Sequence, residues 1–291
     1  PDIWRPLLGD MEKFAASGGK AEAIVRVIVT RLAERLYPLF EQSGGEQGLV
    51  CAQVNPAKAG DAGAMLDMAH RIAKWAPNIC VKLPATLAGL HVLEECVAEG
   101  TSVCATAGFT VSQTLAVAER HRQGLERAAK AGRKGGKCFA VVMVGRLDDY
   151  LRDVALDRSA KIGDADIIQA GTAVIKRAYT LFNARGYQAV LIPAGMRGAY
   201  HVAALSGAKL VMSIAPHIAA MTQSLPTPWV QHIDEPVAPD VLDRLRTLDE
   251  FVRAYEPEGM APQEFITYGA VQKTLSQFIE NGWARMETDV L

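Results

Sequence analysis

The chain has 291 residues, 49% of them hydrophobic, and a formal net charge of -1 at pH 7. This balance argues against a nucleic-acid partner or an anionic membrane, and no apolar stretch reaches the roughly 18 residues of a membrane span. We therefore expect a small-molecule partner. Domains commonly have roughly 150 residues, but α/β barrels of this length are often undivided, so residues 1–291 are predicted to form one domain.

The five cysteines form no CxxC pair, and four of them lie in apolar, strand-like runs. They are Cys51, Cys80, Cys96, Cys104 and Cys138. This usage is typical of buried, reduced thiols and predicts a cytoplasmic protein. Because the sequence starts at Pro1 rather than at methionine, a removed targeting peptide stays open.

Short β-rich runs alternate with helix-period segments along most of the chain, which predicts an α/β fold with a parallel sheet. A helical period first covers residues 24–40 and precedes the first strand. The six predicted strands are Gly48–Asn55, Ile79–Leu83, Ser102–Phe109, Cys138–Val144, Ala189–Ala194 and Leu210–Ala215.

Helices are predicted between these strands. One spans Leu87 to Val97, with Thr86 as its N-cap and Gly100 as its stop, and another runs from Ile168 to Phe182 behind the possible cap Asp164. Beyond Pro216 we expect a polar, Pro-rich stretch and then C-terminal helices near residues 241–255 and 262–281.

Lys82 is the most informative residue, because it interrupts the apolar strand Ile79–Leu83. Removal from water disfavours the ammonium form of a lysine and so favours the neutral amine, which can attack a carbonyl to form a Schiff base. A strand lysine can instead lie at a sheet edge or extend its amine to solvent.

Strand alternation groups polar side chains with Lys82. Gln53 and Asn55 share one face of their strand with Cys51, and Lys82 shares its face with Cys80. If these faces and that of Thr106 line a barrel interior, the four polar residues gather at the carboxyl ends of the strands, where barrel enzymes hold substrates. They could alternatively be core polar groups that satisfy one another, but that reading leaves Lys82 without an anionic partner.

Several motifs resemble the transaldolase family, a (β/α)8 TIM barrel family related to the fructose 6-phosphate aldolases. The resemblance covers roughly Gly48 to His217. The matching segments are Val81–Gly89, Glu99–Thr110, Val144–Tyr150, Ala194–Arg197 and Ser213–Pro216. It implies catalysis through a lysine Schiff base, with no cofactor and no metal.

The resemblance also implies roles for single residues. Lys82 is the Schiff-base lysine, Thr106 helps to hold the catalytic water, and Arg146 and Arg197 bind substrate phosphate. Gln53 falls where transaldolases carry a glutamate and the related aldolases carry a glutamine.

The implied reaction is transfer of a dihydroxyacetone unit between sugar phosphates, as in the pentose phosphate pathway. Aldol cleavage of a ketose phosphate without transfer is one alternative, and a non-catalytic barrel that binds a sugar phosphate is another. Whether the protein forms a homo-oligomer stays open.

Three departures limit the match. The family's first two strands, which carry an acid/base aspartate and an asparagine, are not recognisable, so upstream residues are expected to close the barrel. Met143 stands where the aldolases carry a tyrosine, and Cys104 and Val141 stand where an asparagine and a serine are usual. We therefore expect a less polar site than is typical.

The six histidines show no HExxH-like spacing, which argues against a catalytic metal.

Overall fold

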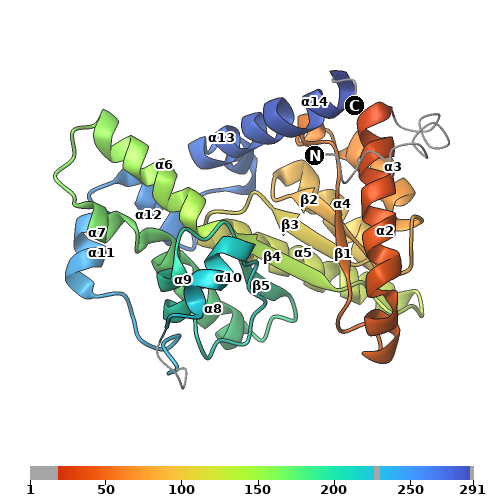
Figure 1. Ribbon diagram of the computed structural model, residues 1–291, viewed down its shortest axis with the longest axis horizontal. Helices are drawn as coiled ribbons and strands as arrows, with labels where there is room; N and C mark the ends of the chain where they lie inside the picture. The colour runs from red at the N-terminus through yellow and green to blue at the C-terminus, as the bar shows by residue number, and fades with distance from the viewer. Residues whose placement is uncertain (1–18, 226–229, 289–291) are drawn as a thin grey trace. The chain divides into compact units, whose positions relative to one another are not determined.

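The computed structural model describes residues 19–225 and 230–288 (Figure 1). The chain divides into two compact units. Unit 1 comprises Pro1–Cys104, Gln123–Lys137 and Lys273–Leu291, and unit 2 comprises Ala105–Arg122 and Cys138–Gln272. None of the described helices is long and apolar enough to cross a membrane. The single-domain organisation of residues 1–291 stays a prediction.

Unit 1 is built around two parallel strands, β1 (Val50–Gln53) and β2 (Ile79–Pro84). Their register pairs Cys51 with Cys80 and Gln53 with Lys82. The alternate residues of β1, Val50 and Ala52, are buried. Because side chains alternate across a strand, one face of the β1–β2 pair is apolar and the other carries the thiols, Gln53 and Lys82.

Helices α3 (Ala62–Ala73) and α4 (Leu87–Ala98) belong to the same unit, and α3 packs against both β2 and α4. The cap and stop predicted for α4 are confirmed. The Thr86 hydroxyl accepts the Gly89 amide at 3.1 Å, and Gly100 takes a φ of 91°, which ends the helix. The short helix η4 (Pro56–Lys58) connects β1 to α3.

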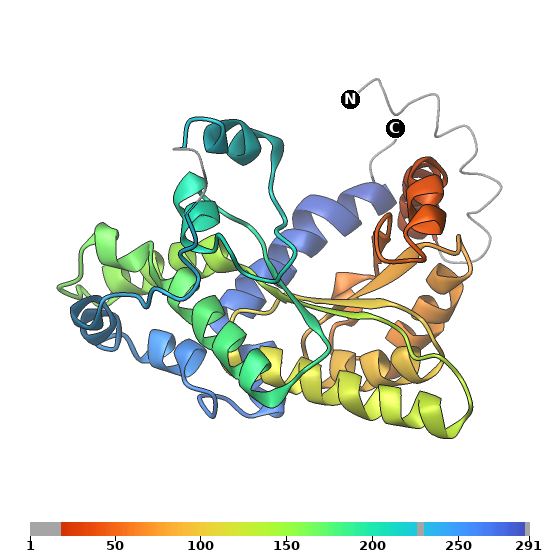
Figure 2. The same ribbon diagram turned by 90° about the horizontal axis from the view of Figure 1, so that it is seen from below.

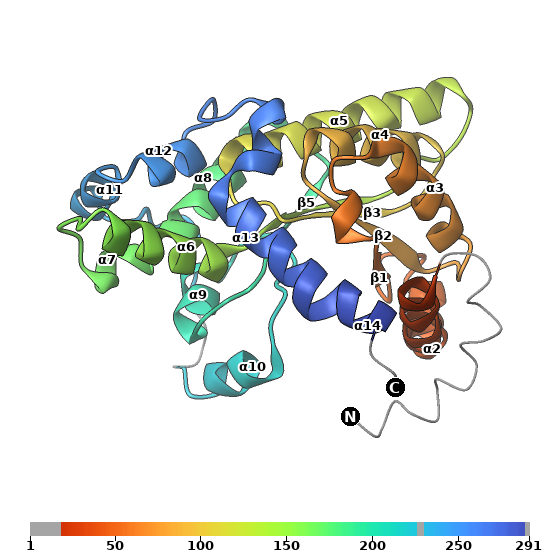
Figure 3. The ribbon, with the colours of Figure 1, turned by 90° about the horizontal axis from the view of Figure 1, so that it is seen from above.

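Helix α2 (Lys20–Gln42) confirms the helix predicted over residues 24–40. Asn78 joins it to the rest of unit 1. The side chain of Asn78 is buried, and its amide nitrogen donates to the carbonyls of Ala33, in α2, and Gly48, each at 2.9 Å. An ion pair of 2.7 Å joins Glu22 to Arg71. Helix α14 (Ala284–Thr288) contacts α2 (Figure 3).

Unit 2 contains the parallel strands β4 (Cys138–Val142) and β5 (Val190–Pro193). Helix α6 (Val144–Asp157) follows β4 directly and packs against α8 (Ala170–Arg185), which also contacts α12 (Asp249–Tyr255). The remaining helices of this unit are α7 (Asp164–Ile167), α9 (Ala199–Ala204), α10 (Pro216–Thr222), α11 (Pro239–Leu245) and η5 (Pro262–Thr267).

Three elements run across the boundaries between the units. They are β3 (Val103–Thr106), α5 (Val111–Lys130), which Figure 2 shows as one uninterrupted yellow-green helix, and α13 (Gly269–Phe278). With β3 the described residues hold five strands, and each overlaps a predicted one; β2 extends one residue further than predicted, to Pro84. The α/β fold with parallel strands is confirmed, and the strands and helices alternate as in an α/β barrel.

The sixth predicted strand, Leu210–Ala215, is wrong. The segment runs along β5, since the amides of Val211 and Ser213 donate to the carbonyls of Leu191 and Pro193 at 3.1 and 3.0 Å. A parallel ladder also needs amides of β5 to donate back, and Pro193 has no N–H. The pairing is therefore one-sided and no regular strand forms.

The helix predicted behind Asp164 is divided. Asp164 is the first residue of α7 and makes no capping bond; its carboxylate pairs with Arg152 instead. A new helix, α8, starts at Ala170, where the Gly171 amide donates to the Asp148 carboxylate at 2.8 Å. That bond satisfies an amide that the first turn of a helix leaves free.

The C-terminal predictions need similar corrections. Residues 241–255 form two short helices, α11 and α12. Residues 262–281 begin as a 3-10 helix, η5, continue as α13 and end in a π-helix, η6 (Ile279–Trp283). A short helix, α10, begins at Pro216, where a polar stretch without helix was expected. Its first residue is a proline, which suits the first turn because that position needs no amide hydrogen.

Candidate functional site

Lys82 and Gln53 lie side by side on the polar face of β1 and β2. They are register partners, and both side chains are half-buried. Within residues 19–225 and 230–288, no carboxylate forms an ion pair with Lys82. The alternative of a solvated edge lysine is weakened by its half-burial, and the alternative of a paired core lysine finds no partner in the described chain. A half-buried amine beside a neutral amide is compatible with imine chemistry.

Three thiols surround this pair. Cys80 and Cys104 are buried as predicted, but Cys51 is exposed, which corrects the expectation that all the strand cysteines are buried. The Cys51 sulfur accepts hydrogen bonds from the thiols of Cys104 and Cys80 and lies near the Lys82 charge, and these three contacts lower the pKa of the Cys51 thiol.

Asn55 lies two residues beyond the end of β1, so strand alternation does not fix its direction. Its side-chain oxygen accepts the Ala57 amide at 2.9 Å and caps η4. A contact between Asn55 and a substrate stays a prediction, whereas in the structure its side chain serves as the N-cap of η4.

Thr106 ends β3 and is 3% exposed, and its hydroxyl has no hydrogen-bond partner among the described residues. The turn that follows is strained, because Ala107 takes a φ of 52°. Gln113 holds this turn: its side chain donates to the Ala107 carbonyl at 3.1 Å and accepts the Phe109 amide at 2.9 Å. Thr106 therefore presents a free hydroxyl from a fixed backbone.

Unit 2 brings Arg146 and Arg197 together. Arg146 lies in the first turn of α6, and Arg197 lies on the loop after β5. The two segments touch at Gly145, where an added Cβ would lie 2.6 Å from Cγ of Arg197. Gly195 has a φ of 64°, and a Cβ there would lie 3.5 Å from Cγ of Arg146. At Gly145 only glycine allows this approach, because a Cβ would lie 2.3 Å from the Gly195 carbonyl oxygen, and at Gly195 the positive φ favours glycine.

The two guanidinium groups affect each other's electrostatics. Burial and the neighbouring charge of Arg197 lower the pKa of Arg146, and Asp149 only partly opposes them. Two cations held close together at a helix N-terminus favour an anion between them.

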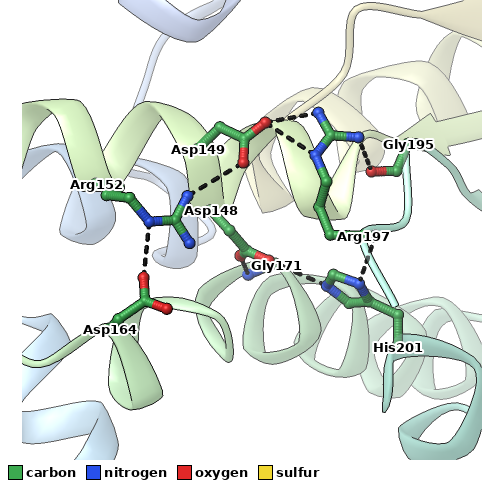
Figure 4. A network of polar contacts seen from close by, with 8 residues as sticks. All are labelled: Asp148, Asp149, Arg152, Asp164, Gly171, Gly195, Arg197 and His201. Atoms are coloured by element: carbon green, nitrogen blue, oxygen red, sulfur yellow. Dashed lines mark hydrogen bonds and ion pairs between the residues drawn. The ribbon is translucent and has the colours of Figure 1, made fainter. Parts of the chain in front are cut away.

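Asp149 reduces the freedom of Arg197. Its Oδ2 accepts two hydrogen bonds from the Arg197 guanidinium, at 2.9 and 2.6 Å, and its Oδ1 accepts one from Arg152 at 3.2 Å (Figure 4). Asp149 thus pairs with both Arg197 and Arg152.

Sequence reasoning missed the buried pair of His201 and Asp148, whose side chains are 0% and 1% exposed. His201 Nδ1 accepts the Arg197 backbone amide at 3.2 Å, so Nε2 carries the ring proton and faces Asp148 Oδ2 at 3.0 Å. Burial raises the pKa of Asp148, although the hydrogen bonds from His201 and Gly171 oppose this. The pair anchors the loop that carries Arg197 to α6.

The structure shows the burial of the three positions at which the sequence departs from the family motifs, and a less polar site stays a prediction. Cys104, Val141 and Met143 are all buried. Among the residues that the structure describes, no three His, Cys, Asp or Glu side chains are placed to hold a metal ion.

The parallel strands that alternate with helices place the protein in the α/β class, to which the α/β barrels belong. The family model for Transaldolase/Fructose-6-phosphate aldolase matches residues 7–279, so the chain belongs to this family. The (β/α)8 barrel is the fold of the family, and its members include transaldolases and related aldolases.

Curated relatives support this assignment. The chain is 31% identical over 182 residues to a transaldolase of Mycobacterium ulcerans (strain Agy99), covering 58% of this chain and 48% of the relative. It is 32% identical over 182 residues, with the same coverage, to a transaldolase of Mycobacterium tuberculosis (strain ATCC 25618 / H37Rv). For the transaldolase of Mycolicibacterium smegmatis the identity is 31% over 184 residues, 59% of this chain and 48% of the relative. The chain thus spans about half the length of the curated relatives it matches.

Proposed function

We propose that this protein is a transaldolase that transfers a dihydroxyacetone unit between sugar phosphates through a Schiff base on Lys82. The observation that carries the proposal is a half-buried strand lysine with a neutral register partner and, among the described residues, no carboxylate ion pair. Membership of the family supports it. All five cysteines are free, in keeping with a reducing, cytoplasmic setting.

In the proposed reaction, the Lys82 amine attacks the ketose carbonyl at C2 and expels water to form a protonated imine. The imine nitrogen accepts the electron pair of the C3–C4 bond as that bond breaks, while the C4 hydroxyl proton passes to a base. An aldehyde leaves and an enamine remains on Lys82. The enamine then attacks the carbonyl carbon of an acceptor aldehyde, and hydrolysis of the new imine releases the longer ketose.

Arg146 and Arg197 are proposed to bind the substrate phosphate. Forked guanidinium donors match phosphate oxygens, and α6 adds the free amides of its first turn. Burial and, to a smaller extent, the charge of Arg197 lower the pKa of Arg146, and an anion bound between the two cations would oppose both effects.

Thr106 and Gln53 are proposed to orient the water that hydrolyses the imine. The buried Thr106 hydroxyl has no partner among the described residues and can donate to or accept from such a water. Neither side chain takes up a proton at neutral pH, so a separate base is required. An amide at Gln53 is also the residue of the related aldolases, which favours aldol cleavage without transfer as the second candidate.

Reductive trapping tests the Schiff base. Incubation with a ketose phosphate and borohydride should attach one sugar-derived group to Lys82, located by mass spectrometry of peptides, and Lys82→Met should take up none. Lys58→Met, which removes an exposed lysine of unit 1, is the matched control and should label as the wild type does.

Label on another lysine, or activity that survives in Lys82→Met, would contradict the mechanism. Binding of the ketose phosphate without any trapping would instead indicate a non-catalytic sugar-phosphate-binding barrel. Trapping together with release of free dihydroxyacetone in the presence of an acceptor would indicate the aldolase.

A further inference from the structure

The polar face of β1 and β2 carries more sulfur than the proposed sugar chemistry uses. Cys51 and Cys80 are register partners on adjacent parallel strands, two residues before the Gln53–Lys82 pair. Cys104, at the start of β3, donates a hydrogen bond to Cys51. Of the three, only Cys51 is exposed. An oxidant from solvent therefore reaches one thiol of a contiguous group.

The surroundings of Cys51 favour its thiolate. The two neighbouring thiols donate to its sulfur, and the positive charge of Lys82 is close. The thiolate is the form that attacks electrophiles, and accessible thiolates next to cations and a second thiol are typical of redox-sensitive cysteines. Cys96 and Cys138 differ: both are buried, and burial raises the pKa of Cys96 to about 12.

Register selects the partner of an oxidised Cys51. Adjacent parallel strands are about 4.8 Å apart, inside the range of roughly 4.4–6.8 Å between Cα atoms that disulfides span. In unit 1, β2 lies between β1 and the first residues of β3, since the Val81 amide donates to the Ser102 carbonyl. The same hydrogen bond places Cys104 opposite Lys82 rather than Cys80, so its Cα atom is two strand spacings, about 9.6 Å, across the sheet and two residues along it from that of Cys51, too far for a disulfide without backbone movement.

We propose that Cys51 is a reversible oxidation site that reacts with hydroperoxides and is resolved by Cys80 as an intramolecular disulfide. In the first step the Cys51 thiolate attacks the O–O bond of the peroxide. The bond breaks, the sulfur loses two electrons to become a sulfenic acid, and the departing oxygen takes up a proton and leaves as water from hydrogen peroxide or as an alcohol from an organic hydroperoxide. In the second step the Cys80 sulfur attacks the Cys51 sulfur, the S–S bond forms, and the S–O bond breaks. The hydroxide takes the thiol proton and leaves as water. A dithiol reductant reverses the modification.

The test uses the full chain and does not depend on sugar chemistry. Reduced protein is exposed to hydrogen peroxide, quenched with catalase, blocked with N-ethylmaleimide and digested without reductant. Mass spectrometry should find a peptide pair joined through Cys51 and Cys80, with Cys96, Cys104 and Cys138 alkylated, and reductant should restore both thiols. Cys51 should be lost about tenfold faster than Cys96 or more, given its access and thiolate character.

Variants separate the roles of the thiols. Cys80→Ser should stop the reaction at a Cys51 sulfenic acid that dimedone traps, and Cys104→Ser should slow oxidation but give the same cross-link. Cys96→Ser, which removes a buried cysteine of α4, is the matched control and should behave as the wild type. A cross-link between other cysteines, dimedone labelling away from Cys51, or loss of Cys96 as fast as Cys51 would overturn the proposal.

Discussion

Gln53 is the register partner of Lys82, and its side chain is proposed to control the reaction of the Lys82 imine or enamine with water. Its amide can hold a water molecule but cannot deprotonate it at neutral pH, whereas a glutamate can do both. General acid–base help contributes roughly 10²–10⁴-fold to a rate, so this single atom exchange has a large expected effect.

We predict that Gln53→Glu raises transfer relative to free aldol cleavage. The assay supplies a ketose phosphate with and without an acceptor aldehyde and compares transfer product with released dihydroxyacetone. Gln47→Glu, which adds the same charge at an exposed position of unit 1, is the control and should leave the ratio unchanged. An unchanged ratio in Gln53→Glu would make Gln53 a packing residue.

The two arginines of unit 2 differ in how far they are buried. Arg146 is half-buried, whereas Arg197 is more exposed and already pairs with Asp149 at 2.6 Å. Loss of a desolvated charge-assisted pair costs roughly 2–5 kcal/mol, and exposed pairs contribute less. Arg146 is therefore expected to matter more than Arg197.

Accordingly, Arg146→Ala should raise KM for a phosphorylated ketose roughly 30-fold or more, with little change for the unphosphorylated sugar, and Arg197→Ala should have a smaller effect of the same kind. Arg158→Ala removes an exposed arginine at the end of α6 that pairs with Asp249, and should change neither KM. Equal losses on both sugars would remove the phosphate assignment.

At the scale of elements, the Asp148–His201 pair joins α6, the start of α8 and the loop that carries Arg197. Asp148 accepts from both Gly171 and His201, so each carboxylate oxygen has a donor. Asparagine has the same shape but offers one acceptor. In Asp148→Asn, either Gly171 loses its acceptor or His201 must change tautomer and lose the Arg197 amide.

Asp148→Asn should therefore lower the free energy of unfolding by roughly 1–3 kcal/mol, the cost of an unsatisfied buried polar group, and weaken phosphate binding through Arg197. Chemical denaturation and inhibition by inorganic phosphate measure the two effects. Asp157→Asn, at an exposed position of the same helix, should change neither. Loss of stability with unchanged phosphate inhibition would limit the pair to a structural role.

The same elements show what local sequence can predict. The apolar runs predicted β1 to β5, and Thr86 and Gly100 predicted the start and the end of α4. These predictions succeed because strand patterns and helix caps act within a few residues. Strand alternation also predicted that Gln53 and Lys82 face the same way as Cys51 and Cys80. The break before α8 was not predictable, since it depends on a carboxylate 23 residues away in sequence.

Tertiary contacts explain the other differences. The sixth predicted strand does not form because Pro193, in the neighbouring strand β5, has no N–H to donate. The hydrophobic pattern of residues 210–215 contains no information about this proline. The pairing of Arg197 with Asp149 joins residues 48 apart in sequence. His201 lies four residues after Arg197, about one helical turn away. No sequence motif identifies its ring nitrogen as the hydrogen-bond acceptor of the Arg197 backbone amide.

At the scale of the whole molecule, most boundaries between the two units do not follow the ends of elements. Three of the four boundaries fall inside β3, α5 and α13, and the fourth lies directly before β4. A helix propagates cooperatively, so an unfolded half destabilises the half that remains. This continuity predicts that both units unfold in a single transition, as expected for one domain.

The decisive variant is Arg122→Pro, in the interior of α5 next to a boundary between the units. Proline there removes a backbone hydrogen bond and costs roughly 3 kcal/mol. Arg122→Ala removes the same exposed ion pair with Glu119, of 2.6 Å, but keeps the helix, and is the matched control. Hydrogen exchange of β2 in unit 1 and of β4 in unit 2 should lose protection by equal free energies in Arg122→Pro, and by little in Arg122→Ala. If only one strand loses protection, or if the wild type melts in two steps, the units unfold separately and residues 1–291 are not one domain.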